Sequence, residues 1–389
     1  LQRINQIYSK NNTIKECGRF CRADGVLRKT LSGFTWSGFA TCRSAMCPYC
    51  GAVKAKGHRE EMKRVLERLY EGGGSCLFAT FTNSREGKGL KELYRLQQRV
   101  VSRMLQGSFK KKLEDKYGYE GKFSKPEVTI RVEYKNDGQG DFHPHLHLLM
   151  CFDRKLKDSE IQEIDSELFR KWSKRMNQEG LSAYREFTRV EQPKNIKAMG
   201  SYITKLCGSL SCEMTSLDTK NGKGSVSYFQ LMMMLTKGRT KEMNYRLIRL
   251  LREYQLEMKG TRFISVSRNL RKKYLPELFI EGRELTEQEV EEFFEAEAIQ
   301  QEKDAAQIVI HHIPQMVGAA AMKSRLKNKI LTLCEYSDDF VARFDKLCIE
   351  VRKAVDDDRE GRKLLPYNYI DDVSYRLELL IDECSFCIH

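Results

Sequence analysis

Two alternating segments with a turn between them constrain the fold of this chain most strongly. Val128–Tyr134 and Phe142–Phe152 alternate apolar and polar residues, which predicts two β-strands. The stretch Asn136–Gly140 (NDGQG) separates them and has the residue types of a tight turn. We therefore expect an antiparallel hairpin, and with it an antiparallel sheet.

The remaining pattern surrounds this hairpin with helices and further strands. Leu77–Thr82 and Ala183–Val190 are predicted strands. Apolar residues at helical spacing predict helices over 57–71, 90–113, 157–176, 194–206, 228–258 (in one piece or interrupted near Lys237–Gly238), 286–308 and 321–353. This order predicts an α+β fold centred on an antiparallel sheet. The phosphate-binding loop of nucleotide-driven motors is absent from the sequence.

The histidines are concentrated on the second hairpin strand. Three of the seven lie in His143-Pro-His145-Leu-His147. Alternate residues of a strand share a face, so His145 and His147 would point together, with α-carbons about 6.6–7 Å apart. His143 and His147 would lie about 13 Å apart, too far to serve one ion easily. The alternative is a pair of packed or surface histidines. His143 would either support a metal-binding histidine or be a neighbour only.

A carboxylate on the first hairpin strand would complete a metal site. If the turn is centred near residue 138, Glu133 lies opposite His143 and diagonal to His145. Two imidazoles and a carboxylate suit Mg²⁺, Mn²⁺, Co²⁺ or Zn²⁺ and leave positions for substrate oxygens. We expect Glu133, His145 and His147 to hold a catalytic divalent ion.

A metal that polarises a phosphate needs a nucleophile. Tyr-x-x-Lys occurs at Tyr119–Lys122, in a loop-like stretch, and at Tyr202–Lys205, on a predicted helix. Residues three apart share a helix face, so Tyr202 and Lys205 would be presented together. The lysine could hold a phosphate or stabilise the phenolate.

In this order, the motifs resemble those of the HUH endonucleases, and among them the single-tyrosine initiators of plasmid rolling-circle replication. The matching residues are Phe78-Ala-Thr-Phe-Thr-Asn83, the His-Pro-His-Leu-His strand with Glu133 upstream, Tyr202-Ile-Thr-Lys205, Glu253-Tyr254, Lys259-Gly-Thr-Arg262 and Ser267-Arg-Asn-Leu-Arg271. They span about residues 40–275.

The resemblance implies a ferredoxin-like or RNA-recognition-like sheet with Mg²⁺ or Mn²⁺ on its exposed face. Tyr202 would attack the scissile phosphate and leave a 3′-hydroxyl and a 5′-phosphotyrosine bond. The partners would be single-stranded or hairpin origin DNA, a host helicase and a polymerase. One departure is Ala198, where some relatives carry a water-activating glutamate; Glu191 or another residue would have to replace it.

Five of the 13 cysteines precede residue 51. Cys42-x4-Cys47-x2-Cys50 has the spacing of a zinc knuckle. Similarity to relatives with an upstream Cys-Gly pair favours Cys17 as the fourth ligand of a structural zinc. Cys21 is the alternative to Cys17, and His58 a further one. A redox role for Cys47-x-x-Cys50 would need a thioredoxin-like context, which is absent.

The net charge of +14 is unevenly distributed. Residues 1–280 carry 54 Lys+Arg and 30 Asp+Glu, a net of +24, whereas 281–389 carry 14 and 24, a net of −10. The basic part suggests a nucleic acid partner. With the resemblance, the expected DNA contacts are Lys259, Arg262, Arg268 and Arg271.

We therefore expect a zinc-binding segment over 1–56, a nicking and joining domain over 57–280, and an acidic, mainly helical extension over 281–389 that could mediate self-association. The chain has no apolar stretch long enough for a membrane span and no N-terminal signal pattern, so we expect a cytoplasmic location. The alternatives are a single-tyrosine transposase or mobilisation relaxase, and a non-catalytic zinc-containing DNA-binding regulator.

Overall fold

The computed structural model describes residues 1–389 apart from 20, 22, 31–32, 37, 134–140, 194–224, 238–239, 263, 305–308, 324–325, 367 and 386–389. These residues form two compact units. One comprises Leu1–Lys10 and Ser44–Phe294, and the other comprises Asn11–Arg43 and Glu295–His389. The functional division at residues 56 and 280 stays a prediction.

An antiparallel sheet forms the centre of the first unit, and the predicted α+β class is confirmed. Its strands run in the order β6-β3-β5-β4-β7, and β8 pairs with β4. Their bounds are β3 Ser75–Phe81, β4 Tyr119–Arg131, β5 Phe142–Phe152, β6 Arg189–Glu191, β7 Ser225–Val226 and β8 Ser265–Val266. Along the chain, β3 to β6 follow the order strand, helices, strand, strand, helix, strand.

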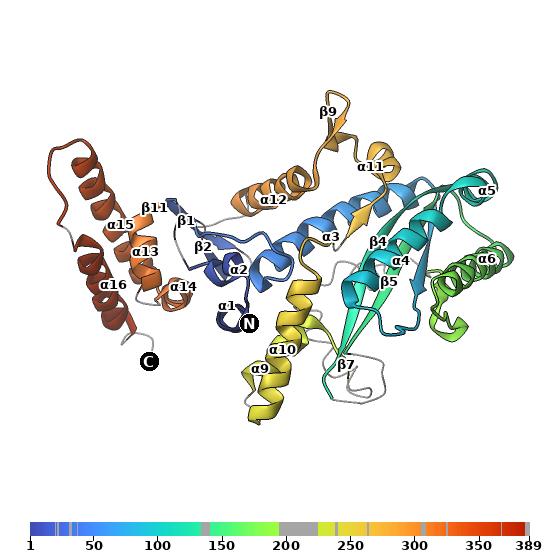
Figure 1. Ribbon diagram of the computed structural model, residues 1–389. Helices are drawn as coiled ribbons and strands as arrows, with labels where there is room; N and C mark the ends of the chain where they lie inside the picture. The colour runs from blue at the N-terminus through green and yellow to red at the C-terminus, as the bar shows by residue number, and fades with distance from the viewer. Residues whose placement is uncertain are drawn as a thin grey trace. The chain divides into compact units, whose positions relative to one another are not determined.

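One face of this sheet is largely apolar. It carries Leu77 and Phe81 of β3 and Leu146 and Leu148 of β5, all at most 1% exposed. Helices α4 (Leu90–Met104), α5 (Gly107–Tyr117) and α6 (Asp158–Gln178) cover it (Figure 1). The apolar stripes predicted for these helices are the surfaces that pack on the strands.

The opposite face is divided into two halves. Cys76, Phe78, Leu149 and Cys151 form an apolar half, which packs against α3 (Pro48–Glu71) and α11 (Arg268–Tyr274). The other half bears His143, His145 and His147, because β5 continues with the same alternation beyond Leu149. The histidines thus lie on the half of the sheet that this core cluster does not include.

Several predicted elements end elsewhere. The helix expected over 90–113 is two helices, because the chain turns at Gln106 and Gly107, where the glycine has φ of 61°. The stretch 228–258 forms two helices, α9 (Tyr228–Thr236) and α10 (Lys241–Glu257), so the expected alternative of an interruption near Lys237–Gly238 is confirmed. Strand β4 begins at Tyr119 rather than 128, so the expected loop there is wrong. Of the strand expected over 183–190, only Arg189–Glu191 forms, after a 3-10 turn at Arg185–Phe187.

The second unit has its own sheet and helical core. Strands β1 (Gly25–Thr30), β2 (Gly33–Trp36) and β11 (Val309–Ile313) pair in the order β11-β1-β2. Trp36, Phe340 and Phe344 are buried in its core. Its helices are α2 Asn12–Glu16, α13 Gln315–Lys323, α14 Lys327–Tyr336, α15 Asp338–Arg359 and α16 Tyr369–Ser385.

Five shorter or connecting elements complete the description: α1 Gln2–Tyr8, the 3-10 turn Pro276–Leu278, β9 Phe279–Ile280, β10 Arg283–Glu284 and α12 Glu287–Asp304. Helices predicted over 286–308 and 321–353 correspond to α12 and to the set α13 to α15. Over the described residues, no helix combines the length and apolar content needed to cross a bilayer.

Candidate active site

Strand β5 presents three imidazoles beside one another. Directly opposite them on β4 lie three polar residues, with the pairs His143–Thr129, His145–Glu127 and His147–Lys125. Opposite residues of an antiparallel pair point to the same face, so this half of the sheet has two rows of polar side chains.

Two threonines contact His145 and His147 from the other side. Thr80 belongs to β3, and Thr82 directly follows that strand. Thr80 pairs with His147, and its Oγ1 lies 3.1 Å from Nδ1 of that ring. Thr82 Oγ1 lies 2.8 Å from Nδ1 of His145. In the tautomer that binds metals through Nε2, each Nδ1–H donates to a hydroxyl, which orients the ring. The motif Phe78–Asn83 therefore supplies one hydroxyl to His147 and one to His145.

The carboxylate beside the histidines is Glu127. Its Oε2 lies 2.7 Å from Nε2 of His147, and the residue pairs with His145. The predicted hairpin register is wrong, since Thr129 rather than Glu133 lies opposite His143. Glu133 is exposed and lies beyond the end of β4, where its carbonyl accepts a hydrogen bond from Arg246 at 3.2 Å. The hairpin centre is two residues earlier than expected, which moves Glu127 into the site.

His143 contacts its neighbour on the strand instead of Glu127. Its Nδ1 lies 3.2 Å from His145 Nε2, and its Nε2 lies 3.2 Å from the carbonyl of Asn83. Burial lowers the pKa of His143, the Asn83 carbonyl opposes that shift, and Arg85 and Arg131 reinforce it. A neutral ring that supports His145 agrees with this placement.

The donor set suits a divalent cation. His145 Nε2, His147 Nε2 and the Glu127 carboxylate are two borderline and one hard ligand. Among the described residues, one group of three or more possible metal ligands has all its ligand atoms within 4.8 Å of one another. That group consists of four cysteines and includes none of the histidines. The histidine site is thus a set of paired donors: His147 with Glu127, and His145 with His143.

The predicted nucleophile Tyr202, its partner Lys205 and Ala198 lie outside the described residues. The other Tyr-x-x-Lys tyrosine is described. Tyr119 is 7% exposed, and burial raises the pKa of its phenol. A phenol packed in this core is poorly placed to meet DNA, which makes Tyr119 the weaker of the two candidates.

The four cysteines expected to bind zinc lie together. Sγ atoms of Cys17, Cys42, Cys47 and Cys50 are all within 4.8 Å of one another. This is a cluster that could hold a metal such as zinc, since four thiolates are a common tetrahedral ligand set. The alternative ligand Cys21 is outside this group, and burial raises the pKa of its thiol to about 11.

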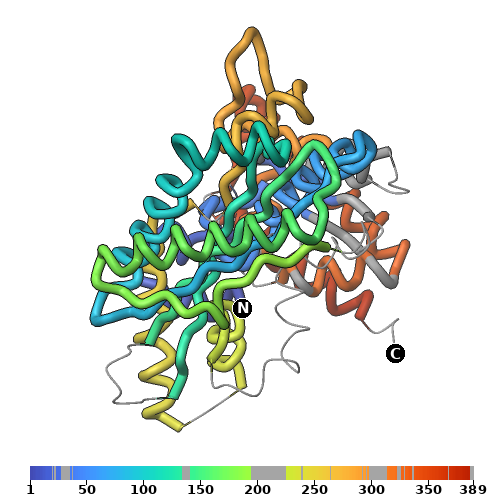
Figure 2. The backbone as a smooth tube through the Cα atoms, turned by 90° about the vertical axis from the view of Figure 1, so that its right-hand side faces the viewer, coloured from blue at the N-terminus to red at the C-terminus, as the bar shows by residue number. Residues whose placement is uncertain are grey.

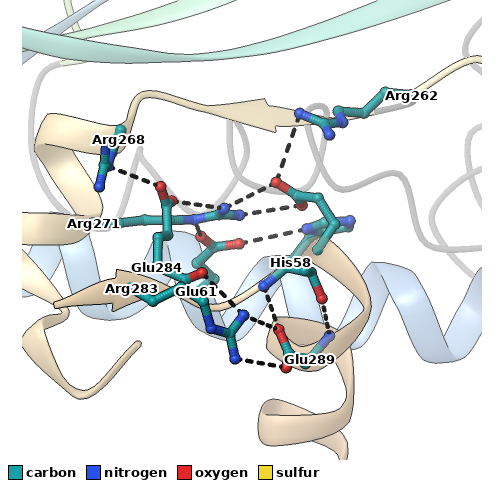
Figure 3. Close-up of polar contacts among 10 residues, drawn as sticks. His58, Glu61, Arg262, Arg268, Arg271, Arg283, Glu284 and Glu289 are labelled. Carbon is teal, nitrogen blue, oxygen red and sulfur yellow. Dashed lines mark hydrogen bonds and ion pairs between the residues drawn. The ribbon is translucent and has the colours of Figure 1, made fainter. Parts of the chain in front are cut away.

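Arg271, expected to contact DNA, is buried instead. The residue is 2% exposed, and its Nε donates to Glu61 at 2.5 Å (Figure 3). Nη1 donates to Glu287 at 2.9 Å and to Glu284 at 3.3 Å. Burial opposes the charged form, but these carboxylates outweigh it and raise the pKa of Arg271. The guanidinium joins α3, α11, β10 and α12, so a DNA contact does not fit its placement.

The other three basic residues expected to bind DNA are exposed. Arg262 forms an ion pair with Glu287 at 3.7 Å, and Arg268 forms one with Glu284 at 3.3 Å (Figure 3). Lys259 lies just after α10 and is also exposed. Two of the three already have carboxylate neighbours, so a phosphate would have to compete with them.

Thr80, Thr82 and Glu127 were not among the residues assigned to the site from sequence. Alternation could have found the threonines, since Thr80 and Thr82 are two apart on a predicted strand next to the histidine strand. Glu127 could be found only with the correct hairpin register, which the sequence of the turn leaves open.

The chain is thus a mixed α+β protein whose antiparallel sheet carries a histidine-lined face and whose four-cysteine cluster could hold a metal. A family model described as a replication protein matches residues 35–315, and the chain belongs to that family. Membership supports a plasmid replication protein of the rolling-circle type. No curated protein and no solved structure gives a significant match.

Proposed function

We propose that this protein nicks and rejoins DNA at a replication origin through a 5′-phosphotyrosine intermediate, and thereby starts rolling-circle replication of a plasmid or related mobile element. The observation that carries the proposal is the histidine pair: both rings are held at Nδ1 by threonines, and a carboxylate lies opposite. The match to a replication protein family supports the same reading.

The topology supports the finer fold assignment. The strand order β6-β3-β5-β4, with helices after the first and third strands in the chain, supports a ferredoxin-like split β-α-β arrangement. We propose that this is the HUH type of sheet, with the histidine half of its face as the catalytic surface.

His145, His147 and Glu127 would hold Mg²⁺ or Mn²⁺, and Glu127 takes the role that the sequence suggested for Glu133. The donor set fits such an ion. When bound, the ion would neutralise charge on the scissile phosphate. Thr80 and Thr82 would keep the two imidazoles in the metal-binding tautomer and orientation.

The bond changes follow from a tyrosine nucleophile. The phenol of Tyr202 gives up its proton as its oxygen forms a bond to phosphorus, the bond from phosphorus to the 3′ oxygen breaks, and the 3′ oxygen takes up a proton. Lys205 would hold the phosphate or stabilise the phenolate. Rejoining reverses these changes when a 3′-hydroxyl attacks the phosphotyrosine. Glu191, exposed at the end of β6, is a candidate to activate water in place of Ala198.

The cysteine cluster would be structural. We propose that Cys17, Cys42, Cys47 and Cys50 bind one Zn²⁺, whose four protein ligands leave no position for a substrate. We further propose that origin DNA is bound as a single strand or hairpin. A host helicase and polymerase would extend the 3′ end in the cytoplasm. The acidic C-terminal extension would mediate any self-association.

Nicking can be tested with single-stranded oligonucleotides tiled across the DNA element that carries the gene. The protein is incubated with each oligonucleotide and Mn²⁺, and adducts are separated on a denaturing gel. We expect an adduct that is lost in Tyr202→Phe and in His145→Ala/His147→Ala. Tyr119→Phe is the matched control and should leave the adduct intact, because that phenol is buried.

An adduct that survives in Tyr202→Phe would contradict the nucleophile. The absence of any adduct in a protein that binds Mn²⁺ and DNA would favour the non-catalytic regulator. Adducts confined to transfer-origin or transposon-end sequences would favour a relaxase or transposase, while the replication family match favours an origin of replication.

A further inference from the structure

A pair of exposed aromatic rings lies on the turn that leads into the edge strand β6. Tyr184 is 47% exposed and Phe187 is 53% exposed. Their ring centroids are 6.3 Å apart, with an angle of 82° between the planes. A planar group stacked on one ring would therefore meet the edge of the other, an arrangement that aromatic rings favour.

This turn is held in place by contacts on both sides. Arg185 donates to Asp165 of α6 at 3.0 Å, and its guanidinium lies 5.1 Å from the ring centroid of Phe169. The same side chain donates to the carbonyl of Thr188 at 3.3 Å. Figure 2 shows the chain turning back after α6 and running beside that helix. Exposed rings on a turn with these contacts are pre-organised to bind a planar partner.

The turn is also continuous with the histidine site. Ser182, just before it, exchanges hydrogen bonds with Ser84 at 2.7 and 2.8 Å, next to the Asn83 carbonyl that contacts His143. After the turn, Arg189 pairs with Thr80, which in turn pairs with His147. Two strand spacings, about 10 Å, separate the α-carbons of Arg189 and His147. A single strand lying across the sheet could contact both.

The charges along this edge of the sheet favour a phosphate of that strand beside Arg189 and not beside Glu191. Arg189 is exposed and lies opposite Thr80, on the histidine face of the sheet, while its Nε donates to the carbonyl of Glu186 at 3.0 Å. Glu191, one step further along the edge, carries the opposite charge and would repel a phosphate. The combination of an exposed cation with two exposed rings matches the chemistry of unpaired nucleotides, in which a phosphate alternates with a planar base.

We propose that Tyr184 and Phe187 stack on unpaired bases of single-stranded DNA while Arg189 contacts a phosphate, so that this turn holds the strand next to the histidine site. The inference rests on the proposed nicking function for its ligand. It assigns the turn Tyr184–Arg189 a DNA-binding role that the motifs do not assign.

The test is equilibrium binding without chemistry. Fluorescein-labelled (dT)20 is titrated with the Tyr202→Phe protein in buffer without added divalent ions, and anisotropy is measured at several salt concentrations. Stacking of one base is typically lost with about a 5- to 100-fold drop in affinity, so we expect Phe187→Ala and Tyr184→Ala each to weaken binding by that factor. Arg189→Gln should reduce the slope of log affinity against log salt by about 0.7.

Matched variants separate stacking from folding. Phe187→Tyr keeps an aromatic ring and should bind like the parent, whereas Phe187→Leu keeps apolar bulk and should bind nearly as weakly as Phe187→Ala. Tyr375→Ala removes an aromatic side chain that is 61% exposed on α16 and should have no effect. A 20-base-pair duplex should be bound equally by the parent and by Phe187→Ala, since paired bases are not available for stacking.

Unchanged (dT)20 affinity in both alanine variants would overturn the proposal, and so would equal losses for the duplex and the single strand. A result in which Phe187→Leu binds like the parent would indicate apolar contact, as with a protein partner, and would also overturn base stacking. This binding is measured without metal and without an adduct. It can therefore support or overturn base stacking even if the protein does not nick DNA.

Discussion

At the scale of single residues, the site depends on short hydroxyl side chains. Thr80 and Thr82 each approach one Nδ1 atom, so the two rings are oriented before any ion binds. Partners of this kind usually account for a 10- to 100-fold change in metal affinity, because they fix the tautomer and orientation of the ligand.

Thr82→Val should therefore weaken Mn²⁺ binding about 10- to 100-fold, since valine keeps the shape of threonine and removes the hydroxyl. Isothermal titration with MnCl₂ measures the change. Thr236→Val is the control, because that hydroxyl bonds to its own helix at Met233. Equal Mn²⁺ affinities in the parent and in Thr82→Val would contradict the orienting role.

A second pair of variants distinguishes the two candidate carboxylates. Glu127→Gln should lower Mn²⁺ affinity, because an amide is a weaker ligand than a carboxylate, while Glu133→Gln should leave it unchanged. The same titration measures both. The opposite pattern would restore the register expected from sequence.

These residues also mark what sequence could predict. Alternation located β5 with its correct bounds, because a half-buried strand must alternate. It could not locate Glu127, since the register depends on how the residues between the strands close the hairpin. In the sequence, Arg271 is one of several basic residues that could contact DNA. Only the packing of the folded chain shows that three carboxylates surround it.

At the scale of elements, that arginine joins segments that are far apart in sequence. Glu61 of α3 is fully buried, and its Oε1 accepts from Arg271 of α11. Burial would raise the pKa of Glu61, but the nearby His58 ring, with its Nδ1 3.6 Å from Oε2, and the hydrogen bond from Arg271 outweigh it, so the pKa lies below the ordinary value. Removing the Glu61 charge takes away one of the three carboxylates around the buried Arg271 guanidinium, while Glu284 and Glu287 remain.

Glu61→Gln should lower the free energy of unfolding by about 1.5–3 kcal/mol at pH 7, measured by urea denaturation, because one charge-assisted hydrogen bond of the buried cluster is lost. Because the folded pKa is lowered, this contribution is present above the unfolded pKa and is lost as pH falls through the folded value. The difference between parent and variant should shrink in acid.

Glu67→Gln removes the exposed partner of Lys63 and serves as the control, with an expected change below about 1 kcal/mol. A loss in Glu61→Gln no larger than in this control would show that the buried pair does not hold α3 and α11 together.

Other element boundaries follow from local chemistry that periodicity does not capture. The apolar stripe continues from α4 into α5, so spacing alone suggests one helix, but Gly107 with a positive φ turns the chain. Strand β4 begins nine residues before the prediction, because Tyr119–Glu127 includes glycine, lysines and a proline that weaken the strand pattern.

At the scale of the whole molecule, two sequence features predict partners: the uneven charge predicts a nucleic acid, and the N-terminal cysteines predict a metal. The net charge of +24 over residues 1–280 suggests a polyanion, and the replication family supports DNA. The four cysteines were chosen from five candidates, and their sulfur atoms lie together. The nucleophile depends on sequence alone, since residue 202 is outside the described part.

The zinc assignment predicts one Zn²⁺ per chain, measured by atomic emission on protein purified without chelator. Cys17→Ser should lose the ion or bind it far more weakly, and should lower the melting temperature, because metal binding contributes directly to folding. Cys21→Ser should keep the ion, since that thiol lies outside the cluster. Loss of zinc in Cys21→Ser with retention in Cys17→Ser would exchange the two assignments.

The most direct measurement of the central claim identifies the residue that carries DNA. An adduct made with Mn²⁺ is digested with nuclease and trypsin, and the peptides are analysed by mass spectrometry. Cleavage after Lys197 and Lys205 releases residues 198–205, which contain one tyrosine. The account predicts a nucleotide mass on this peptide at Tyr202. A nucleotide on any other tyrosine, or an adduct without this modified peptide, would contradict it.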